Sequence, residues 1–169
     1  MTIRQLAEDL GLWTQVESCV HGRCPEESAQ QLLEKIAVIP VKASRATTRL
    51  GAYVFRGRQA VCIRLQFAQD RHRLRLTLLH EIAHACDHLQ ASGSHRRLAH
   101  GPGWQQWALA LGIEPQVGGV CAAVSALHQR RKKLVAVCLG CGAEIYRVRR
   151  LARHGHYLHS TCGGSLKQV

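Results

Sequence analysis

The sequence predicts an α+β fold in two parts: a larger part with a short β-sheet and one long helix, and a small cysteine-rich part. Helix and strand patterns follow one another through residues 1–115, and residues 116–134 have the composition of a basic linker. Residues 135–169 combine short strand patterns with Cys and Gly. With 169 residues, 46% of them hydrophobic, the chain can bury the core of one modest domain and carry an appendage.

The first 45 residues are expected to be largely helical. Thr2 precedes an amphipathic stretch and Gln5 follows three residues later, which is the pattern of a capping box. A second helix pattern covers residues 24–38, where Pro25 is followed by two glutamates. Acidic residues there suit the positive end of the helix dipole.

Two strands are predicted at residues 52–56 and 60–66, joined by a short turn into a hairpin. In the second strand, apolar Val61, Ile63 and Leu65 alternate with Cys62, Arg64 and Gln66. This alternation predicts one buried and one exposed face.

A long helix is predicted over residues 71–90, with Asp70 as its N-cap. Residues 91–97 break it. A shorter helix follows at residues 102–111, and Gly112 and Pro115 end it.

The formal net charge of +12 is concentrated toward the C-terminus. Residues 129–169 contain nine Lys/Arg and one acidic residue, whereas residues 1–128 contain fourteen Lys/Arg and ten acidic residues. We therefore expect a polyanionic partner to meet the C-terminal part first, although a basic surface can also serve solubility alone.

No apolar segment is long enough to cross a bilayer, and the polar N-terminus lacks the apolar centre of a secretory signal. We therefore expect a cytoplasmic protein, nucleoid-associated in a prokaryote, with no membrane partner. In that reducing compartment the eight cysteines are expected to be thiols or metal ligands and not disulfides.

The segment His-Glu-Ile-Ala-His at residues 80–84 predicts a metal site on the long helix. Four residues turn a helix by about 40° net and advance it by about 6 Å, so His80 and His84 can share one ion. Glu81 lies about 100° round from His80 and can flank that ion. In this pattern two imidazoles bind zinc and the carboxylate takes a proton from the water that zinc activates. The simpler alternative is a pair of surface histidines.

A catalytic zinc usually has three protein ligands, and the third should come from a segment that folds back onto the helix. His100 is the favoured candidate, because Gly101 and Pro102 fix a turn after it and Trp104 begins the next helix. His95 is the other candidate, but it lies in the Ser/Gly/Arg stretch of residues 91–97 and has no such turn or aromatic residue after it.

His88 and Asp87 are not expected to be ligands of this ion. His88 lies about 12 Å from His80 along the helix axis, too far for one zinc with bonds of about 2.1 Å. Asp87 is too close in sequence to His84 to approach the ion from the opposite side.

The stretches "LLHEIAHACDH" and "AHGPGWQQWALALG" resemble the SprT-like metalloproteases, the group that includes the Spartan proteases. Members share a His-Glu-x-x-His helix, then a loop His followed by Gly and a helix that begins with an aromatic residue. The predicted hairpin is similar to the strands before their active-site helix. The resemblance covers residues 50–115 and the C-terminal element, and residues 1–45 only loosely. It implies a small zincin-like protease domain over residues 1–115 whose activity is coupled to DNA.

The cysteine-rich part predicts a second, structural zinc site. Cys138 and Cys141 form a Cys-x2-Cys pair, and His159 and Cys162 repeat this spacing after a gap of seventeen residues. This is the spacing of a zinc ribbon, in which four ligands close the coordination sphere. The SprT-like family often ends in such a ribbon, usually with Cys where this chain has His159. The competing imidazole, His156, lacks the spacing.

Basic and aromatic residues in and before the ribbon are the candidate DNA contacts. Arginine suits phosphates and tyrosine can stack on an unpaired base, so single-stranded regions are an expected target. The candidates are Arg130, Arg131, Lys132, Lys133, Tyr146, Arg147, Arg149, Arg150, Arg153 and Tyr157.

The remaining cysteines are expected to serve packing. Cys19, His21 and Cys24 have the residue types of a third metal site, but no second pair lies near them, so a loop or core role is favoured. The others are expected in the core: Cys62, Cys86 and Cys121.

These features predict a zinc metalloendopeptidase with one catalytic and one structural zinc. With the resemblance, they predict DNA stimulation and substrates that are DNA-bound or DNA-crosslinked proteins. One alternative is a non-catalytic DNA-binding or regulatory zinc protein with a vestigial protease site. Another is a peptidase with a soluble substrate and no use for DNA.

Overall fold

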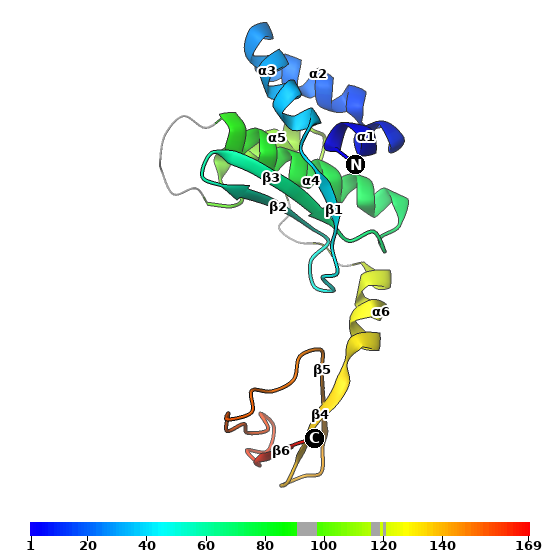
Figure 1. Ribbon diagram of the computed structural model, residues 1–169, viewed down its shortest axis with the longest axis vertical. Coiled ribbons are helices and arrows are strands. Elements are labelled where there is room, and N and C mark those ends of the chain that lie inside the picture. The colour runs from blue at the N-terminus through cyan, green and yellow to red at the C-terminus, as the bar shows by residue number, and fades with distance from the viewer. Residues whose placement is uncertain (91–97, 116–118, 120) are drawn as a thin grey trace. The chain divides into compact units, whose positions relative to one another are not determined.

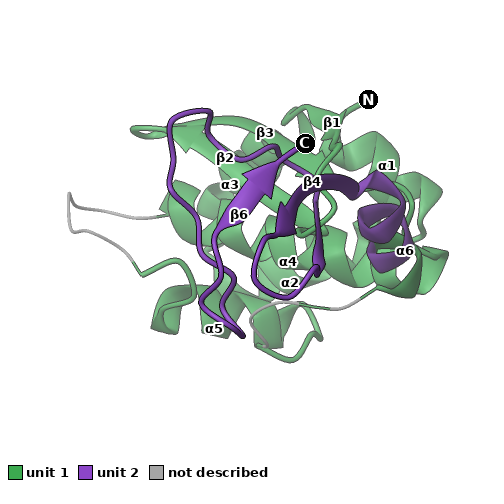
Figure 2. Ribbon diagram, turned by 90° about the horizontal axis from the view of Figure 1, so that it is seen from below, with its two compact units in different colours: residues 1–124 green, residues 125–169 purple. Residues whose placement is uncertain are grey.

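The computed structural model describes residues 1–90, 98–115, 119 and 121–169, and within them it is α+β with six helices and two small sheets (Figure 1). The chain forms two compact units, Met1–Val124 and Ser125–Val169 (Figure 2). The predicted helix break at 91–97, which includes His95, lies outside the described residues, as do residues 116–118 and 120 of the predicted linker.

Three helices begin the first unit: α1 (Ile3–Asp9), α2 (Trp13–Arg23) and α3 (Glu26–Ala37). The predicted capping box is present at the start of α1, where Thr2 and Gln5 bond to each other's backbone N–H groups. Helix α2 was not predicted. It begins without a side-chain cap and buries residues at helical spacing, namely Trp13, Val16, Cys19 and Val20.

The sheet of the first unit has the order β1-β3-β2. Its strands are β1 (Val41–Ala43), β2 (Gly51–Arg56) and β3 (Gln59–Leu65). The β2–β3 hairpin is the predicted one, and β1 adds in parallel to β3. The register shifts between Val54 and Phe55, so the predicted alternation fails locally: Val61 is 41% exposed and Cys62 is buried. A β-bulge of this kind breaks the two-residue period.

Helix α4 (Arg71–Gln90) has the predicted bounds, and the backbone N–H of Arg73 donates to Asp70 Oδ1 over 2.8 Å, as expected of an N-cap. It lies along one face of the sheet (Figure 1) and contacts β2, β3 and α5 (Pro102–Ala110). Among the described residues, no helix has both the length and the apolar character needed to span a membrane.

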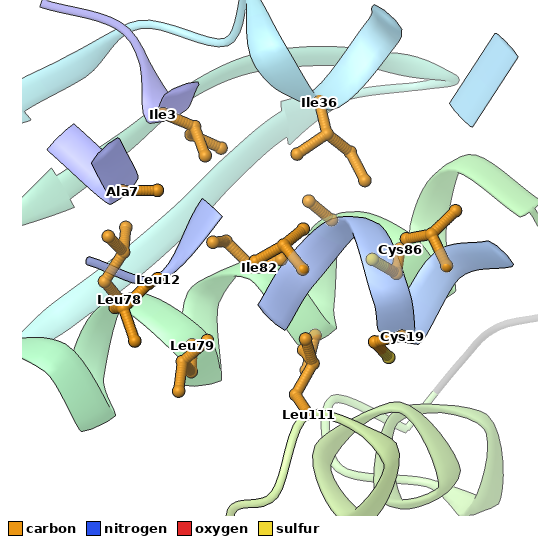
Figure 3. Close-up of a cluster of buried hydrophobic side chains, with 14 of the residues drawn as sticks. Ile3, Ala7, Leu12, Cys19, Ile36, Leu78, Leu79, Ile82, Cys86 and Leu111 are labelled. Atoms are coloured by element: carbon orange, nitrogen blue, oxygen red, sulfur yellow. The ribbon is translucent and has the colours of Figure 1, made fainter. Parts of the chain in front are cut away.

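The core of the first unit gathers around α4. Side chains from α1, α2, α3 and α4 and the end of α5 meet there, including Ile3, Cys19, Ile36, Ile82 and Leu111 (Figure 3). The apolar side chains of α4 between residues 78 and 86 are buried. His80 and His84 of the same segment are only half-buried.

The second unit has a sheet of order β5-β4-β6, made of β4 (Lys133–Cys138), β5 (Glu144–Arg147) and β6 (Leu166–Gln168). Helix α6 (Ala122–Arg131) precedes it, and the boundary between the two units falls inside α6. These residues were expected to be linker. The structure shows that this part of the predicted linker is helical, and its three alanines and two arginines favour a helix.

Candidate active site and zinc-binding cluster

His80, His84 and His100 bring their Nε2 atoms together. The His100 Nε2 atom lies 3.2 Å from the Nε2 atom of His80 and 3.2 Å from that of His84. All three atoms lie within 4.8 Å of one another. Nitrogen ligands of a tetrahedral zinc are about 3.3–3.4 Å apart. The three imidazoles therefore fit one zinc ion with a position left open.

Burial keeps these imidazoles in the form that binds metal. Burial, together with a smaller effect of the neighbouring histidines, lowers the pKa of His80 to about 4 and that of His84 to about 3. It also lowers the pKa of His100. The neutral ring has a free nitrogen lone pair at neutral pH, as a zinc ligand requires.

The first turn of α5 holds His100 in place. The Trp104 ring lies 4.5 Å from the His100 ring and 4.8 Å from the His80 ring, centroid to centroid, and its Nε1 donates to the His80 carbonyl over 3.4 Å. Gln105 Nε2 donates to the His100 carbonyl over 3.1 Å. Trp104 is thus a buried anchor for the site.

Glu81 lies next to this cluster and is buried, with 5% of its surface exposed. Burial raises the pKa of Glu81 to about 7, and this effect outweighs a hydrogen bond from the Tyr53 backbone N–H, which acts in the opposite direction. A carboxyl group with a pKa near neutral can both take and return a proton.

Gly51, at the start of β2, lacks a side chain that would clash with Glu81. A Cβ atom at Gly51 would lie 2.5 Å from Glu81 Oε1 and 2.7 Å from Thr77 Cγ2. Sequence reasoning did not find Gly51 or Tyr53, because only the folded chain brings β2 against α4.

We expect Gly51→Ala to displace the Glu81 carboxylate. Overpacking of this kind costs about 1–3 kcal/mol of stability, and any activity that needs Glu81 should fall with it. Thermal unfolding and a peptidase assay measure the two effects. Gly22→Ala is the matched control, because a Cβ at Gly22 would meet nothing within 4 Å apart from its chain neighbours and the backbone of its own helix. An active Gly51→Ala protein of normal stability would contradict this account.

His88 takes part in a structural hydrogen-bond chain. Its Nε2–H donates to the Gly57 carbonyl over 2.9 Å, so its Nδ1 accepts the Tyr53 hydroxyl proton over 2.8 Å. Burial raises the pKa of Tyr53, which keeps that hydroxyl a donor. His88 ties the β2–β3 hairpin to α4 and stays outside the metal cluster, in agreement with its predicted exclusion.

A family model, that of the SprT-like family, matches residues 23–125, which is more than half of the chain. The chain belongs to the SprT-like family. No curated protein and no solved structure gave a match. The SprT-like match includes β1–β3, α4, α5 and all three clustered histidines. It also includes α3, where the sequence resemblance was loose. SprT-like proteins are typically peptidase-related, so this region is a metalloprotease-type domain.

The SprT-like chain has a second candidate metal cluster in its second unit: Cys138, Cys141, His159 and Cys162. The His159 Nδ1 atom lies 3.2 Å from the sulfur of Cys141 and 3.2 Å from that of Cys162. The Cys162 sulfur lies 3.4 Å from that of Cys141 and 3.5 Å from that of Cys138. Sulfur ligands of a tetrahedral zinc lie about 3.7 Å apart. The four side chains fit a closed zinc site, and His159 takes part where His156 does not.

Backbone groups and glycines shape this cluster. Backbone N–H groups of Cys141 and Gly140 lower the pKa of Cys138 to about 6, which favours the thiolate that zinc binds. Gly164 packs against Gly140, and a Cβ atom at Gly164 would lie 2.8 Å from the Cys138 sulfur. The close approach of the two loops therefore needs glycine at this position.

The structure places most candidate DNA contacts on the surface. Arg130 and Arg131 end α6, Lys133 begins β4, Arg147 ends β5, and the other three arginines lie in the loop after β5. All of these are exposed, and Lys132 is half-buried.

The two candidate tyrosines differ. Tyr146 is 51% exposed and its hydroxyl donates to Glu144 over 2.7 Å. Tyr157 is half-buried, packs against the small core of the second unit, and accepts the Ala152 N–H over 3.0 Å. A Cβ at Gly155 would lie 2.5 Å from its ring. Tyr157 thus has a packing role, and its contact with DNA stays a prediction.

The remaining cysteines are buried, as predicted for the core. Cys19 and Cys24 lie inside, whereas His21 is exposed and bonds to Glu26 Oε2 over 3.2 Å. These three do not form a metal cluster among the described residues.

Proposed function

We propose that this SprT-like protein is a zinc-dependent metalloendopeptidase that is stimulated by DNA and cleaves DNA-bound or DNA-crosslinked proteins. The observation that carries the peptidase proposal is the convergence of three neutral imidazoles beside one buried carboxyl group. Such a set has the ligand count and the base of a zinc hydrolase site.

In this proposal the two kinds of residue have separate roles. His80, His84 and His100 would hold the zinc, which would supply Lewis-acid activation of a water and of the peptide carbonyl. Glu81 accepts the proton of the attacking water and returns it to the leaving amine. Gly51 leaves space for this carboxyl group, and the Tyr53 N–H bonds to it.

The charge pattern of the second unit supports DNA as the partner. Lys133 and Arg147 are directly opposite in the β4–β5 ladder, where like charges destabilise a sheet. Neither Lys133 nor Arg147 forms an ion pair with an acidic side chain in the part of the chain that the structure describes. A phosphate backbone would relieve the repulsion between them. Tyr146, the cross-strand neighbour of Leu134, is also exposed and can stack on an unpaired base.

The proposal is tested with zinc-loaded, full-length protein and one substrate protein in two forms, free and crosslinked to single-stranded DNA. We expect faster cleavage of the crosslinked form, and stimulation by added DNA. Equal cleavage of both forms would favour a peptidase that has no use for DNA. No cleavage of either, with tight DNA binding, would favour the non-catalytic alternative.

Replacement of a phosphate contact should change the salt dependence of DNA binding. We expect Arg147→Gln to weaken binding to all sequences alike and to reduce the slope of log K against log salt by about 1. Arg4→Gln is the control, because Arg4 pairs with Glu8 over 2.8 Å in the first unit. Fluorescence anisotropy at several salt concentrations measures both slopes. Equal slopes for the two variants would remove Arg147 from the DNA contacts.

A further inference from the structure

We propose that Asp87 is a positioning residue for the third metal ligand: its carboxylate fixes the first turn of α5, and through that turn it fixes His100. The inference rests on the zinc site proposed above. It assigns a role to a residue that is neither a ligand nor a base.

Asp87 follows His84 by three residues on α4, and its carboxylate lies against Gly103 of α5. A Cβ atom at Gly103 would collide with Asp87 Oδ1 and would lie 3.2 Å from Asp87 Cγ and 3.8 Å from Oδ2. The carboxylate therefore occupies the space that any other residue at position 103 would fill. Gly103 is required by this contact and not by its own backbone conformation, since its φ is not positive.

The start of α5 has backbone N–H groups that no side chain of the N-cap residue can accept. The N-cap residue is Gly101, which has no side chain to accept the free N–H groups of the first turn, and Pro102 stands at the first helical position. The N–H groups of Gly103 and Trp104 have no partner within the helix at these positions. A carboxylate beside them is favoured by both the free donors and the helix dipole.

The first turn of α5 also determines the position of His100, the third metal ligand. His100 precedes Pro102 by two residues, Gln105 bonds to its carbonyl, and Trp104 contacts its ring. Trp104 also bonds to the carbonyl of His80. A shift of the first turn would therefore move His100 relative to His80 and His84. The Nε2 atom of His100 lies 3.2 Å from that of each of the other two, so a small shift would change the geometry of the site. Replacement of a residue that orients a metal ligand typically lowers metal affinity about 10- to 100-fold.

The test measures metal binding by the full-length protein, with Co²⁺ as the probe. Co²⁺ bound by thiolates has a charge-transfer band that the imidazole-only site lacks, so the cysteine cluster is an internal reference. We expect Asp87→Ala and Gly103→Ala to weaken Co²⁺ binding at the histidine site by about 10-fold or more and to change its spectrum. Asp87→Asn keeps the shape and one acceptor oxygen, and it should restore part of the affinity. The cysteine site should not change.

Asp70→Ala is the matched control. Asp70 also caps a helix, but its bond to the Arg73 N–H lies at the far end of α4. Its loss should lower stability and leave the Co²⁺ spectrum unchanged. Wild-type affinity and spectrum in Asp87→Ala would overturn the inference while the proposed function stands. Failure of the wild-type protein to bind Co²⁺ at the histidine site would instead refute the proposed function, and the inference with it.

Discussion

Glu81→Gln should retain both zinc ions and the fold but lose at least about 100-fold in peptide cleavage, the usual contribution of a positioned general base. The amide has nearly the same shape as the carboxyl group and can still accept the Tyr53 N–H, so the contacts with Gly51 and Thr77 should survive. The amide cannot take a proton from the attacking water. The loss should therefore appear in kcat, with little change in substrate binding.

Zinc content, thermal unfolding and cleavage rate are measured on the same preparation. Glu34→Gln is the control, because Glu34 is an exposed carboxylate on α3 that bonds to Gln30 over 3.0 Å. Its rate should equal that of the wild type. Full cleavage by zinc-loaded Glu81→Gln would remove Glu81 from the mechanism and leave the histidine cluster without its base.

Cys162→Ser should unfold the second unit while the first unit remains folded. Apart from the candidate ligand Cys138, the second unit buries a cluster of three residues, Val135, Ala136 and Leu151, with Ile145, Tyr157 and Leu166 packed against them. Zinc contributes about 10–16 kcal/mol to the folding of such small domains, far more than this core can supply. Loss of one of four ligands should therefore cost most of that stabilisation.

Hydrogen exchange measures the result separately in the two units. We expect the amides of β4, β5 and β6 to lose protection in Cys162→Ser, whereas those of α4 keep it. Cys24→Ser is the control, because the Cys24 sulfur accepts a bond from Gln90 and a serine oxygen can replace it. Unchanged protection of β4 without its zinc would show that the second unit does not need the metal to fold.

Local signals in the sequence predicted the parts of the fold that depend on local physics. The bounds of α4, its Asp70 cap and the capping box of α1 follow from residues within one helical turn of one another. His80 and His84 share a face for the same reason. The bracing turn after His100 was visible in the sequence, and the structure brings all three imidazoles together.

Features that depend on contacts between distant segments were not predicted. Gly51 matters only because β2 lies against Glu81, and Gly103 only because α5 begins beside Asp87. The bulge in the β2–β3 hairpin leaves Val61 41% exposed, although the alternation of the strand predicted that it is buried. The packing of Tyr157 was not predicted because the cluster that it packs against includes Val135 and Ala136 of β4, which are distant in the sequence.

The central claim is that three histidines, including one from the loop before α5, hold a single zinc. Zinc analysis of the wild-type protein beside His100→Ala tests it most directly. We predict about two zinc ions per chain in the wild type and about one in the variant, because two imidazoles alone bind zinc weakly. Two zinc ions in both proteins would show that another residue completes the site, and one in both would show that the histidine cluster holds no metal.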